Sequence, residues 1–284
     1  MDDYFAVNRA VWDERAPAHA QSPDYAIDRF LADPDHLSDV VRFDLSRLGD
    51  ISGLRGLHLQ CHIGTDTLSL SRLGAQMTGL DFSGAAVREA RRLVQRVGVD
   101  VDFVQADVYS AVDVLGEQSF DLVFTGIGAL CWLPDIWRWA RAVSALLRPG
   151  GRLFLHEGHP MLWALDPTPA DGKLTVLSAY FERSEPGMDE DDGTYVETDA
   201  TFTTTKSYFW NHGLGEIVSA LLDEGMQLTM LEEHDSVPWN AVIGLMSKRD
   251  DGEWQLTEEP WRLAHSYTLQ AVKPAARPAG RRRG

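Results

Sequence analysis

Acidic and small residues stand where four short apolar runs of this sequence end, and residues of these types can bind a nucleoside. Gly64 and Asp81 follow the first two runs, and Asp107 and Gly126 follow the third and fourth. A carboxylate at a strand end can accept hydrogen bonds from ribose hydroxyls, and a small residue lets a ligand approach the main chain. Asp81 follows the loop at Gln60 by roughly 20 residues, a separation typical of nucleoside sites. The pattern therefore predicts a site for a nucleotide-like ligand.

A layered scaffold is needed to bring these residues together. Between residues 57 and 157 the apolar runs alternate with segments of helical periodicity, which predicts a parallel sheet with helices on both faces. Ser83 is placed to cap the helix that follows the second run. Right-handed crossovers put the loops after successive strands at one edge of such a sheet, so the four residues should converge there. Any one of the acids could instead be a helix cap.

Three later stretches resemble motifs of a known enzyme family. Residues 101–108 and 120–126 have the pattern of a third and a fourth strand, and a Leu-Arg-Pro-Gly-Gly turn at 147–151 precedes the fifth. Together they resemble the class I S-adenosylmethionine-dependent methyltransferases over roughly residues 50–235. The resemblance implies an α/β fold with a Rossmann-like, seven-stranded, doubly wound sheet whose last strand is antiparallel. It also implies S-adenosylmethionine as the cofactor.

The first motif departs from the family pattern. Aligned on the helix that follows, His58 takes the place of the usual acid, and Gln60 and His62 take the places of two glycines. Only Gly64 is kept. The sequence Leu-Gln-Cys-His-Ile-Gly-Thr-Asp-Thr resembles the corresponding motif of a bacterial subgroup of small-molecule methyltransferases. This resemblance implies that Asp66 is the acid near the amino acid end of the cofactor. We therefore assign that role to Asp66.

The resemblance extends to a full set of cofactor-binding positions. By this resemblance, Asp107 would bond the adenine amino group, and Phe82 and Val108 would sandwich the ring. The expected cofactor-binding residues are Trp12, Gln60, His62, Gly64, Asp66, Thr67, Asp81, Phe82, Ser83, Ala106, Asp107, Val108, Thr125 and Gly126.

The N-terminal residues are expected to form a helical lid over the cofactor. Periodicity predicts one helix over residues 4–19 that ends before Pro17, and a second over 38–48. Trp12 and His19 are candidates to touch the ligand, although Trp12 could equally anchor the helix to the core. The predicted divisions are a lid at 1–50, a cofactor-binding core at 51–159, an inserted cap at 160–212, the remainder of the core sheet at 213–273 and a disordered basic tail at 274–284.

The cap is predicted from the long segment between the fifth strand and the next helix, at 213–224. Its charged part, residues 182–192, should be a mobile loop or a hairpin tip, and residues 194–210 have strand composition. Four aromatic residues are candidates to bind an aromatic or cationic acceptor: Trp132, Trp163, Tyr180 and Trp210. They could instead hold a small subdomain together.

Three histidines near the junction of core and cap are candidates for the catalytic base. An oxygen acceptor must lose a proton during methyl transfer, and imidazole is suited to take it near neutral pH. The candidates are His156, His159 and His212. Each could instead be structural, Asn211 or His212 could cap the next helix, and a thiol or amine acceptor needs no base. An Asp/Asn-Pro-Pro-aromatic stretch is absent after the fourth strand, which disfavours a DNA base or glutamine amino group as the acceptor.

Composition excludes several classes of partner. The 284 residues carry a formal net charge of −17, which disfavours nucleic acid. Two cysteines are too few for a disulfide framework and lack metal-type spacing, so no metal is expected and a cytoplasmic location is favoured. No apolar run is long enough to cross a membrane. Cap strands could pair between subunits, which would give a homodimer.

The main hypothesis is a cytoplasmic methyltransferase that acts at oxygen, nitrogen or sulfur of a small, aromatic or heterocyclic metabolite. A nicotinamide-dependent oxidoreductase is disfavoured, because Gln60, His62 and Gly64 do not form the Gly-x-Gly-x-x-Gly that it needs. A catalytically inactive S-adenosylmethionine-binding protein is the third alternative, and the altered first motif motivates it.

Overall fold

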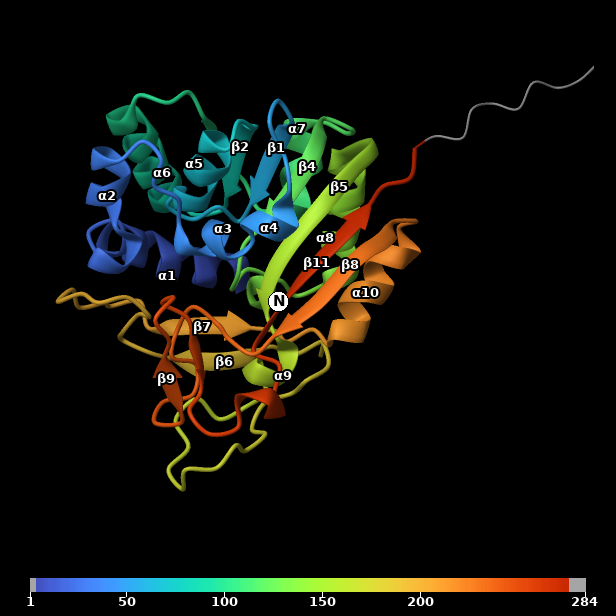
Figure 1. Ribbon diagram of the computed structural model, residues 1–284. Helices are drawn as coiled ribbons and strands as arrows, with labels where there is room; N and C mark the ends of the chain where they lie inside the picture. The colour runs from blue at the N-terminus through green and yellow to red at the C-terminus, as the bar shows by residue number, and fades with distance from the viewer. Residues whose placement is uncertain (1–3, 276–284) are drawn as a thin grey trace, which may run out of the picture.

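The computed structural model describes residues 4–275 and is built on one seven-stranded sheet with helices on both faces (Figure 1). The strand order is β3-β2-β1-β4-β5-β11-β8, and β11 runs antiparallel to both of its neighbours. The predicted fold, including its antiparallel last strand, is therefore confirmed. The strands are β1 (Arg55–Leu59), β2 (Gln76–Asp81), β3 (Asp102–Gln105), β4 (Phe120–Thr125), β5 (Leu147–Gly158), β8 (Gln227–His234) and β11 (Ser266–Val272).

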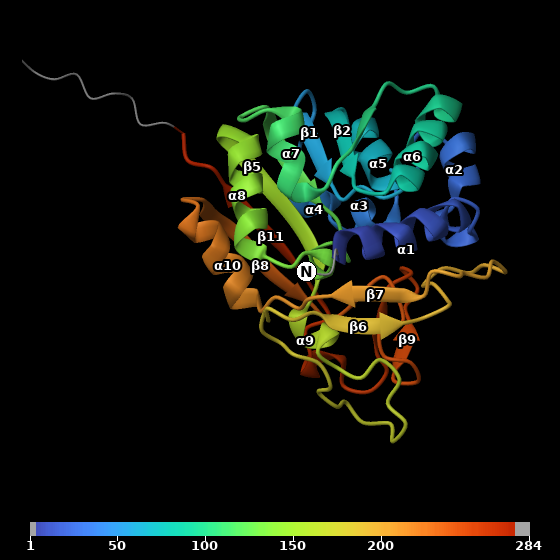
Figure 2. The same ribbon diagram turned by 180° about the vertical axis from the view of Figure 1, so that it is seen from behind.

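Two hydrophobic layers hold helices against this sheet. All six residues of β4 are buried, as expected for a central strand covered on both faces. One layer packs α7 (Ala111–Leu115), α8 (Ile136–Leu146) and α10 (Leu214–Asp223) on the face seen in Figure 2. The other packs α3 (Asp39–Phe43), α4 (Leu45–Leu48), α5 (Thr65–Arg72) and α6 (Gly84–Val97) on the face seen in Figure 1. The order of the strands reverses between β1 and β4, which is where ligands bind in such sheets.

The N-terminal helices differ from the prediction in two places. Helix α1 (Tyr4–His19) continues through Pro17. The missing N–H of Pro17 removes only one hydrogen bond of the helix, and the buried residues Ala16 and His19 hold the last turn in place. The single helix expected over 38–48 is divided at Asp44, whose carboxylate turns into the interior. Two short elements were not predicted, the 3-10 turn Pro23–Tyr25 and α2 (Ile27–Ala32).

The cap contains more of the chain than the sequence predicted. It includes α9 (Pro160–Trp163), the hairpin β6 (Gly187–Glu190) with β7 (Lys206–Phe209), and a second pair, β9 (Met246–Lys248) with β10 (Trp254–Leu256). One apolar cluster joins residues of both insertions, namely Leu162, Leu165, Val237, Val242, Met246 and Leu256. The stretch 235–265, which was expected to belong to the core sheet, therefore packs in the cap.

Several local predictions in the cap and its surroundings are wrong. The charged segment 182–192 contains β6, and only Lys206–Phe209 of the segment 194–210 forms a strand. The residues around Trp261 have the sequence pattern of the start of the last strand, but they form a 3-10 turn in which Trp261 is 77% exposed, and β11 begins at Ser266. The remaining 3-10 turns are Val108–Ser110 and Leu130–Trp132. The predicted basic tail lies largely outside the described residues, and within 4–275 no helix has the length and apolar character that a membrane crossing requires.

Candidate active site

The loop after β1 keeps a left-handed backbone where the family has glycine. Gln60 has φ of 58° and His62 has φ of 47°, beside Gly64 at 81°. A side chain in this region costs roughly 1–2 kcal/mol. Hydrogen bonds offset that cost, since the Gln60 amide donates to the Ala129 carbonyl at 2.7 Å and the His62 N–H donates to Asp81 at 2.8 Å. The Gln60 side chain thus ties the first loop to the loop after β4, and the His62 backbone ties it to the tip of β2.

Gly64 has a packing role that the sequence did not reveal. A Cβ at this position would lie 2.8 Å from the Ala90 side chain and 2.9 Å from the Phe103 ring. Both distances are shorter than van der Waals contact. The absent side chain therefore lets α6 and β3 approach the loop, whereas we had expected it to make room for a ligand.

Asp81, at the tip of β2, organises the same loop. It is 5% exposed, and its two oxygens accept hydrogen bonds from the N–H groups of His62 and Ser83, each at 2.8 Å. Burial raises the pKa of Asp81 to about 6 in spite of these bonds. Ser83 caps α6 as predicted, by accepting from the Ala86 N–H.

The lid helix α1 contacts the N-terminus of α6, where Ser83 is the capping residue. The Asp13 carboxylate on α1 accepts hydrogen bonds from the Ser83 hydroxyl at 2.7 Å and the Ala85 N–H at 2.9 Å. An acid at a helix N-terminus is favoured by the unpaired N–H groups there. Asp13 therefore holds α1 against the core beside Asp81, where ribose hydroxyls are expected.

A cavity of about 180 Å³ lies where the adenine is expected. Its lining residues are Phe5, Arg9, Phe82, Gln105, Ala106 and Asp107. The Asp107 carboxylate also caps the following turn, because it accepts from the N–H groups of Tyr109 and Ser110. Val108, expected to face the ring, belongs to the hydrophobic core instead.

Asp66 and His58 lie beside Gly126, at the edge of the sheet where β1 and β4 end. A Cβ at Gly126 would stand 3.2 Å from an Asp66 oxygen and 3.6 Å from His58 Nε2, so these groups are neighbours. Burial raises the pKa of Asp66 and lowers that of His58 to about 3. His58 is therefore a neutral interior residue, bonded to the Thr67 hydroxyl at 2.9 Å. Thr67 and Thr125 are fully buried, which turns them away from an open site.

Trp12 joins the lid to the first loop. Its ring lies 5.2 Å from the rings of both His62 and Trp132. Next to it, His19 Nδ1 is 2.8 Å from His62 Nε2, and His19 Nε2 is 2.6 Å from the Thr194 hydroxyl. Trp12 thus anchors the helix and borders the cofactor region at the same time.

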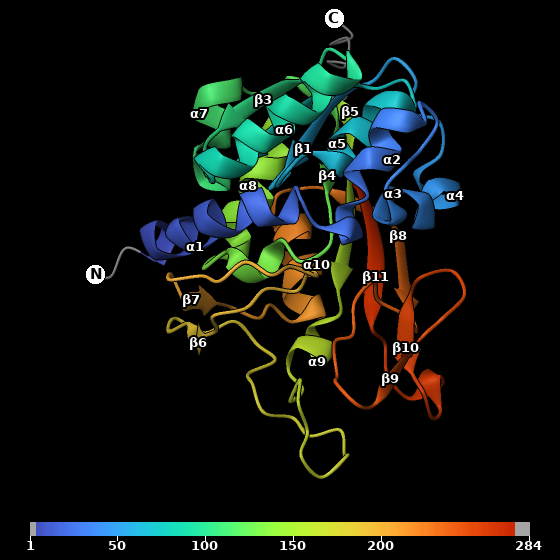
Figure 3. The same ribbon diagram turned by 90° about the vertical axis from the view of Figure 1, so that its left-hand side faces the viewer.

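Helix α1 lies between the core and the inserted cap (Figure 3), and it is hydrogen-bonded to the cap as well. The buried Arg15 guanidinium donates to three cap carbonyls, those of Gly193 at 3.0 Å, Thr204 at 2.8 Å and Asp191 at 2.8 Å. Beside it, Glu14 accepts from the N–H groups of Thr203 and Thr204, which lower its pKa to about 2. The lid and the β6–β7 segment are therefore linked by charge-assisted bonds.

Replacing Arg15 by methionine should loosen this link. Charge-assisted hydrogen bonds are worth about 1.5–3 kcal/mol each, and three are lost, so we expect cleavage within 191–204 by a protease to be at least ~10-fold faster. Limited proteolysis with mass spectrometry measures the rate. Arg42→Met is the matched control, because its exposed ion pair with Asp39 contributes ~0–1 kcal/mol. Equal rates for wild type and Arg15→Met would contradict the expectation.

Comparison with known proteins identifies the domain that carries this site. Residues 57–153 match the model of a family described as a methyltransferase domain. A ubiquinone biosynthesis O-methyltransferase of Xanthomonas euvesicatoria is 34% identical over 184 residues, which are 64% of this chain and 66% of the relative. Residues 57–153 therefore form a methyltransferase domain, and the chain resembles S-adenosylmethionine-dependent methyltransferases over about two thirds of its length.

Solved structures agree with this assignment at the level of the fold. A putative methyltransferase of Listeria monocytogenes superposes with a TM-score of 0.58 at 16% identity, covering 83% of this chain and 96% of that one. A methyltransferase of Mesorhizobium loti gives 0.54 at 20% identity, with coverage of 83% and 98%. The alignment with the Xanthomonas relative spans slightly less than two thirds of that protein's length.

Two of the three candidate bases have both ring nitrogens engaged. His159 caps α9 by accepting from the Met161 N–H, and its Nε2 lies 3.0 Å from Glu233. His212 Nδ1 lies 2.8 Å from Glu182, and its Nε2 faces two backbone carbonyls at 2.9 and 3.1 Å. Both ring nitrogens of His212 thus face oxygen atoms of the protein, so neither is open to an acceptor molecule.

His156 is the third candidate, and it differs from the other two. It is 1% exposed on β5, its Nδ1 lies 2.8 Å from Asp44, and its Nε2 has no hydrogen-bond partner. Among the three candidates it alone presents an unengaged ring nitrogen.

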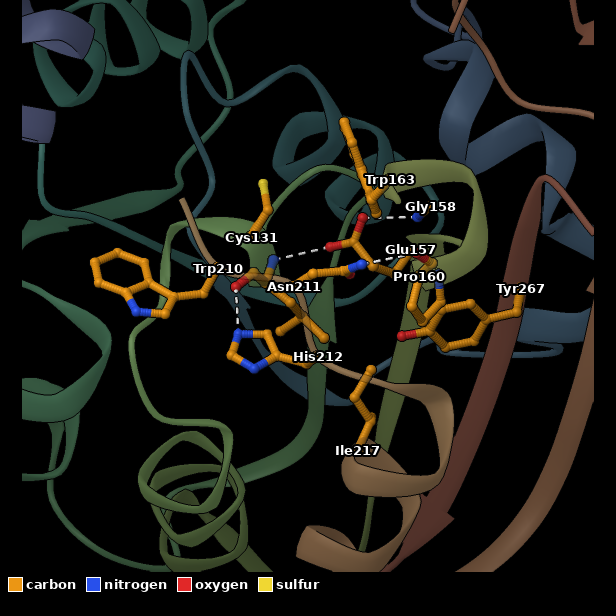
Figure 4. Close-up of a pocket in the computed structure, with 11 residues that line it drawn as sticks. Cys131, Glu157, Gly158, Pro160, Trp163, Trp210, Asn211, His212, Ile217 and Tyr267 are labelled. Atoms are coloured by element: carbon orange, nitrogen blue, oxygen red, sulfur yellow. Dashed lines mark hydrogen bonds between the residues drawn. The ribbon is translucent and has the colours of Figure 1, made fainter. Parts of the chain in front are cut away.

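The aromatic residues expected to bind the acceptor do not share one open pocket. Trp163 and Trp210 line a small cavity of about 10 Å³, room for one water, together with His212 and Tyr267 (Figure 4). Trp132 packs on Trp12, and the Tyr180 hydroxyl accepts from the Leu214 N–H at the start of α10.

Glu157 forms the polar wall of this cavity. Its carboxylate accepts from the N–H groups of Gly128, Ala129, Leu130 and Gly158 at 2.6–2.9 Å. It therefore fixes the loop after β4.

The cap of α10 comes from Glu216, which accepts from the Gly213 N–H at 2.6 Å, so the expectation that Asn211 or His212 caps this helix is wrong.

Proposed function

We propose that this protein transfers the methyl group of S-adenosylmethionine to a hydroxyl oxygen of a small aromatic molecule. The observation that carries the proposal is the edge of β1, β2 and β4, where the cavity beside Phe82 and Asp107 adjoins Asp81 and the first loop. These groups fit an adenine ring, a ribose and, near Asp66, an amino acid end. The Xanthomonas relative, named as an O-methyltransferase, supports oxygen as the accepting atom.

The residues of the chain mainly bind, orient and exclude water. Bound S-adenosylmethionine supplies a methyl group on a positively charged sulfur, which is already activated. Alignment of the acceptor with that methyl group and removal of water can supply much of the rate enhancement. The lid helix, held by Asp13 to the core and by Arg15 to the cap, closes the site. His156 is the residue proposed to take the proton of the acceptor hydroxyl.

The first test is calorimetric titration with S-adenosylmethionine, S-adenosylhomocysteine and NAD. We expect micromolar binding of the two adenosyl ligands and none of NAD. In Ala106→Phe the new ring fills the cavity, so affinity should fall at least ~30-fold, about 2 kcal/mol. Ala200→Phe, in an exposed part of the cap, is the control. Binding of NAD alone, or of no ligand, would refute the proposal.

The second test is turnover. Purified protein with S-adenosylmethionine is offered a panel of phenols, catechols, anilines and thiols, and methylated products are detected by mass spectrometry. Methylation of phenolic or catecholic oxygen is expected. Tight cofactor binding with no product on the whole panel would favour the inactive binding protein.

Location and assembly complete the proposal. We propose a cytoplasmic enzyme, with a small molecule and no nucleic acid or membrane as its partner, on the basis of its acidic charge and two free cysteines. A homodimer through the cap strands is the proposed assembly, and light scattering at micromolar concentration tests it.

A further inference from the structure

Asp44, in the short break between α3 and α4, lies in a buried polar cluster at the end of β5. Its side chain is 1% exposed, and one oxygen is 2.8 Å from His156 Nδ1. Neither this oxygen nor Nδ1 has a hydrogen-bond partner, so the two groups are in contact without a formed hydrogen bond. Phe43 stacks on the imidazole with 5.1 Å between ring centres and 19° between planes. The ring is thus held on its face by an aromatic residue and at one nitrogen by a carboxylate.

Hydrogen bonds fix the other side of the Asp44 carboxylate. Its Oδ1 accepts from the Thr268 hydroxyl at 2.9 Å, and Arg47 lies 3.5 Å away. Because the Thr268 proton is donated to Asp44, the hydroxyl oxygen must accept from His234 Nε2, 2.9 Å away. Burial lowers the pKa of His234 to about 4, so that ring is neutral and carries its proton on Nε2. Oδ1 is therefore fully engaged, and Oδ2 is left for His156.

The consequence is a defined tautomer for His156. A carboxylate beside Nδ1 favours the proton on that atom, which leaves the Nε2 lone pair free. Nε2 is buried and has no hydrogen-bond partner. An unpaired buried nitrogen costs free energy unless a ligand or water completes it. The other two candidates, His159 and His212, have no such free nitrogen.

His156 lies between the cofactor region and the cap. Burial raises the pKa of Asp66, beside Gly126, and of Glu253, on the turn that leads into β10, and a positive charge on His156 would lower both. Glu253 is 6% exposed and one of its oxygens has no partner. His156 and Asp44 also carry polar atoms without a hydrogen-bond partner, and these two residues are in contact.

We propose that Asp44 is the positioning residue of an Asp44–His156 dyad, and that the acceptor hydroxyl binds at His156 Nε2. The inference rests on the proposed function. The acceptor oxygen forms a bond to the methyl carbon as the carbon–sulfur bond breaks, and the electron pair of that bond stays on sulfur. The acceptor proton passes to Nε2 and later to water, while Asp44 stabilises the imidazolium.

The dyad is tested first by the protonation state of His156 in the wild-type protein saturated with S-adenosylhomocysteine. Long-range ¹H–¹⁵N correlation spectra distinguish the two tautomers, and the His156→Gln spectrum assigns the signal. We expect the proton on Nδ1. A proton on Nε2, with the ligand bound, would overturn the dyad and leave the proposed function standing. Absence of ligand binding would instead overturn the proposed function.

Asp44→Asn provides the second measurement. The amide oxygen keeps the bonds from Thr268 and Arg47, so its NH₂ faces His156 Nδ1 and should drive the proton to Nε2. With an acceptor from the panel, kcat/KM should fall by about 100-fold while affinity for S-adenosylhomocysteine stays within ~3-fold of wild type. Glu233→Gln, which alters the partner of His159, should change neither quantity. An unchanged His156 tautomer in Asp44→Asn would refute the positioning role.

The place of the acceptor is tested with sinefungin, an analogue that carries an amine in place of the methyl group. Its ammonium should shift the His156 Nε2 resonance relative to the S-adenosylhomocysteine complex, and should leave His159 unchanged. Identical His156 signals in both complexes would overturn the placement of Nε2 beside the transferred methyl group.

Discussion

Asp81→Ala should weaken binding of S-adenosylhomocysteine by at least ~100-fold, the largest effect expected of any single substitution in the site. The carboxylate holds the N–H groups of His62 and Ser83, and through them the first loop and the start of α6. Charge-assisted bonds are worth about 1.5–3 kcal/mol each, and two are lost together with any bond to the ribose. Calorimetric titration measures the affinity.

Two variants make the Asp81 result interpretable. Asp81→Asn keeps one acceptor oxygen and the size of the side chain, so its affinity should be intermediate. Asp102→Ala removes an exposed acid from the neighbouring strand and should bind as wild type. Thermal unfolding of each variant separates lost binding from lost folding. Wild-type affinity in folded Asp81→Ala would mean that the acid is only a helix cap.

The pKa of Asp81 adds a pH dependence to this prediction. Because burial raises this pKa to about 6, the charged acceptor is present above pH 6 and is lost as the pH falls below it. Wild-type affinity for S-adenosylhomocysteine should therefore decrease from pH 7 to pH 5. Asp81→Asn has no proton to gain there, so its affinity should follow only the remaining groups.

Much of this site could be predicted because it depends on short-range sequence patterns. Strand ends carry Asp81 and Asp107, and Ser83 precedes a helix, so their positions follow from periodicity and from the crossover rule. The direction of a side chain does not follow in the same way. Val108 stands next to Asp107 in the sequence, yet it packs in the core, because the turn after β3 rotates it inward.

The unpredicted contacts join residues that are far apart in the sequence. Asp13 bonds to Ser83, and Asp44 bonds to Thr268, across separations that no local pattern encodes. Gly64 fits a turn, but its close contact with Ala90 depends on how α6 packs. Asp44 also gave a misleading local signal, since a polar residue within a helical stretch is ordinarily assigned to the solvent side.

Acidification from pH 7 to pH 5 should destabilise the ligand-free protein by about 2 kcal/mol or more. Burial lowers the pKa of His58 to about 3 and that of His19 to about 4, so both stay neutral in the folded state. In the unfolded chain both gain a proton as the pH falls through their usual value of about 6.5. Each excess proton on the unfolded state costs about 1.4 kcal/mol of stability per pH unit.

Asp81 opposes this effect over part of the range. Its raised pKa makes the folded state bind one proton more than the unfolded chain between about pH 4 and pH 6, which favours folding as the pH falls. Burial also raises the pKa of Asp66, Glu157 and Glu253, which act in the same direction as Asp81. The histidines whose pKa is lowered by burial act from a higher pH and outnumber these acids, so the net slope remains destabilising. Burial also lowers the pKa of His62 and His234, which adds to the loss in the same direction.

Urea unfolding at pH 7.5, 6 and 5 measures this loss directly. In His58→Gln one titrating group is absent while the amide can still bond to Thr67, so the decrease between pH 7.5 and pH 5 should be smaller than in wild type by about 1–2 kcal/mol. Gln95→Ala, at an exposed position of α6 without a titrating group, is the control and should keep the wild-type pH dependence. Equal stability at all three pH values would show that His58 and His19 are protonated in the folded protein, and the neutral interior described here would then be wrong.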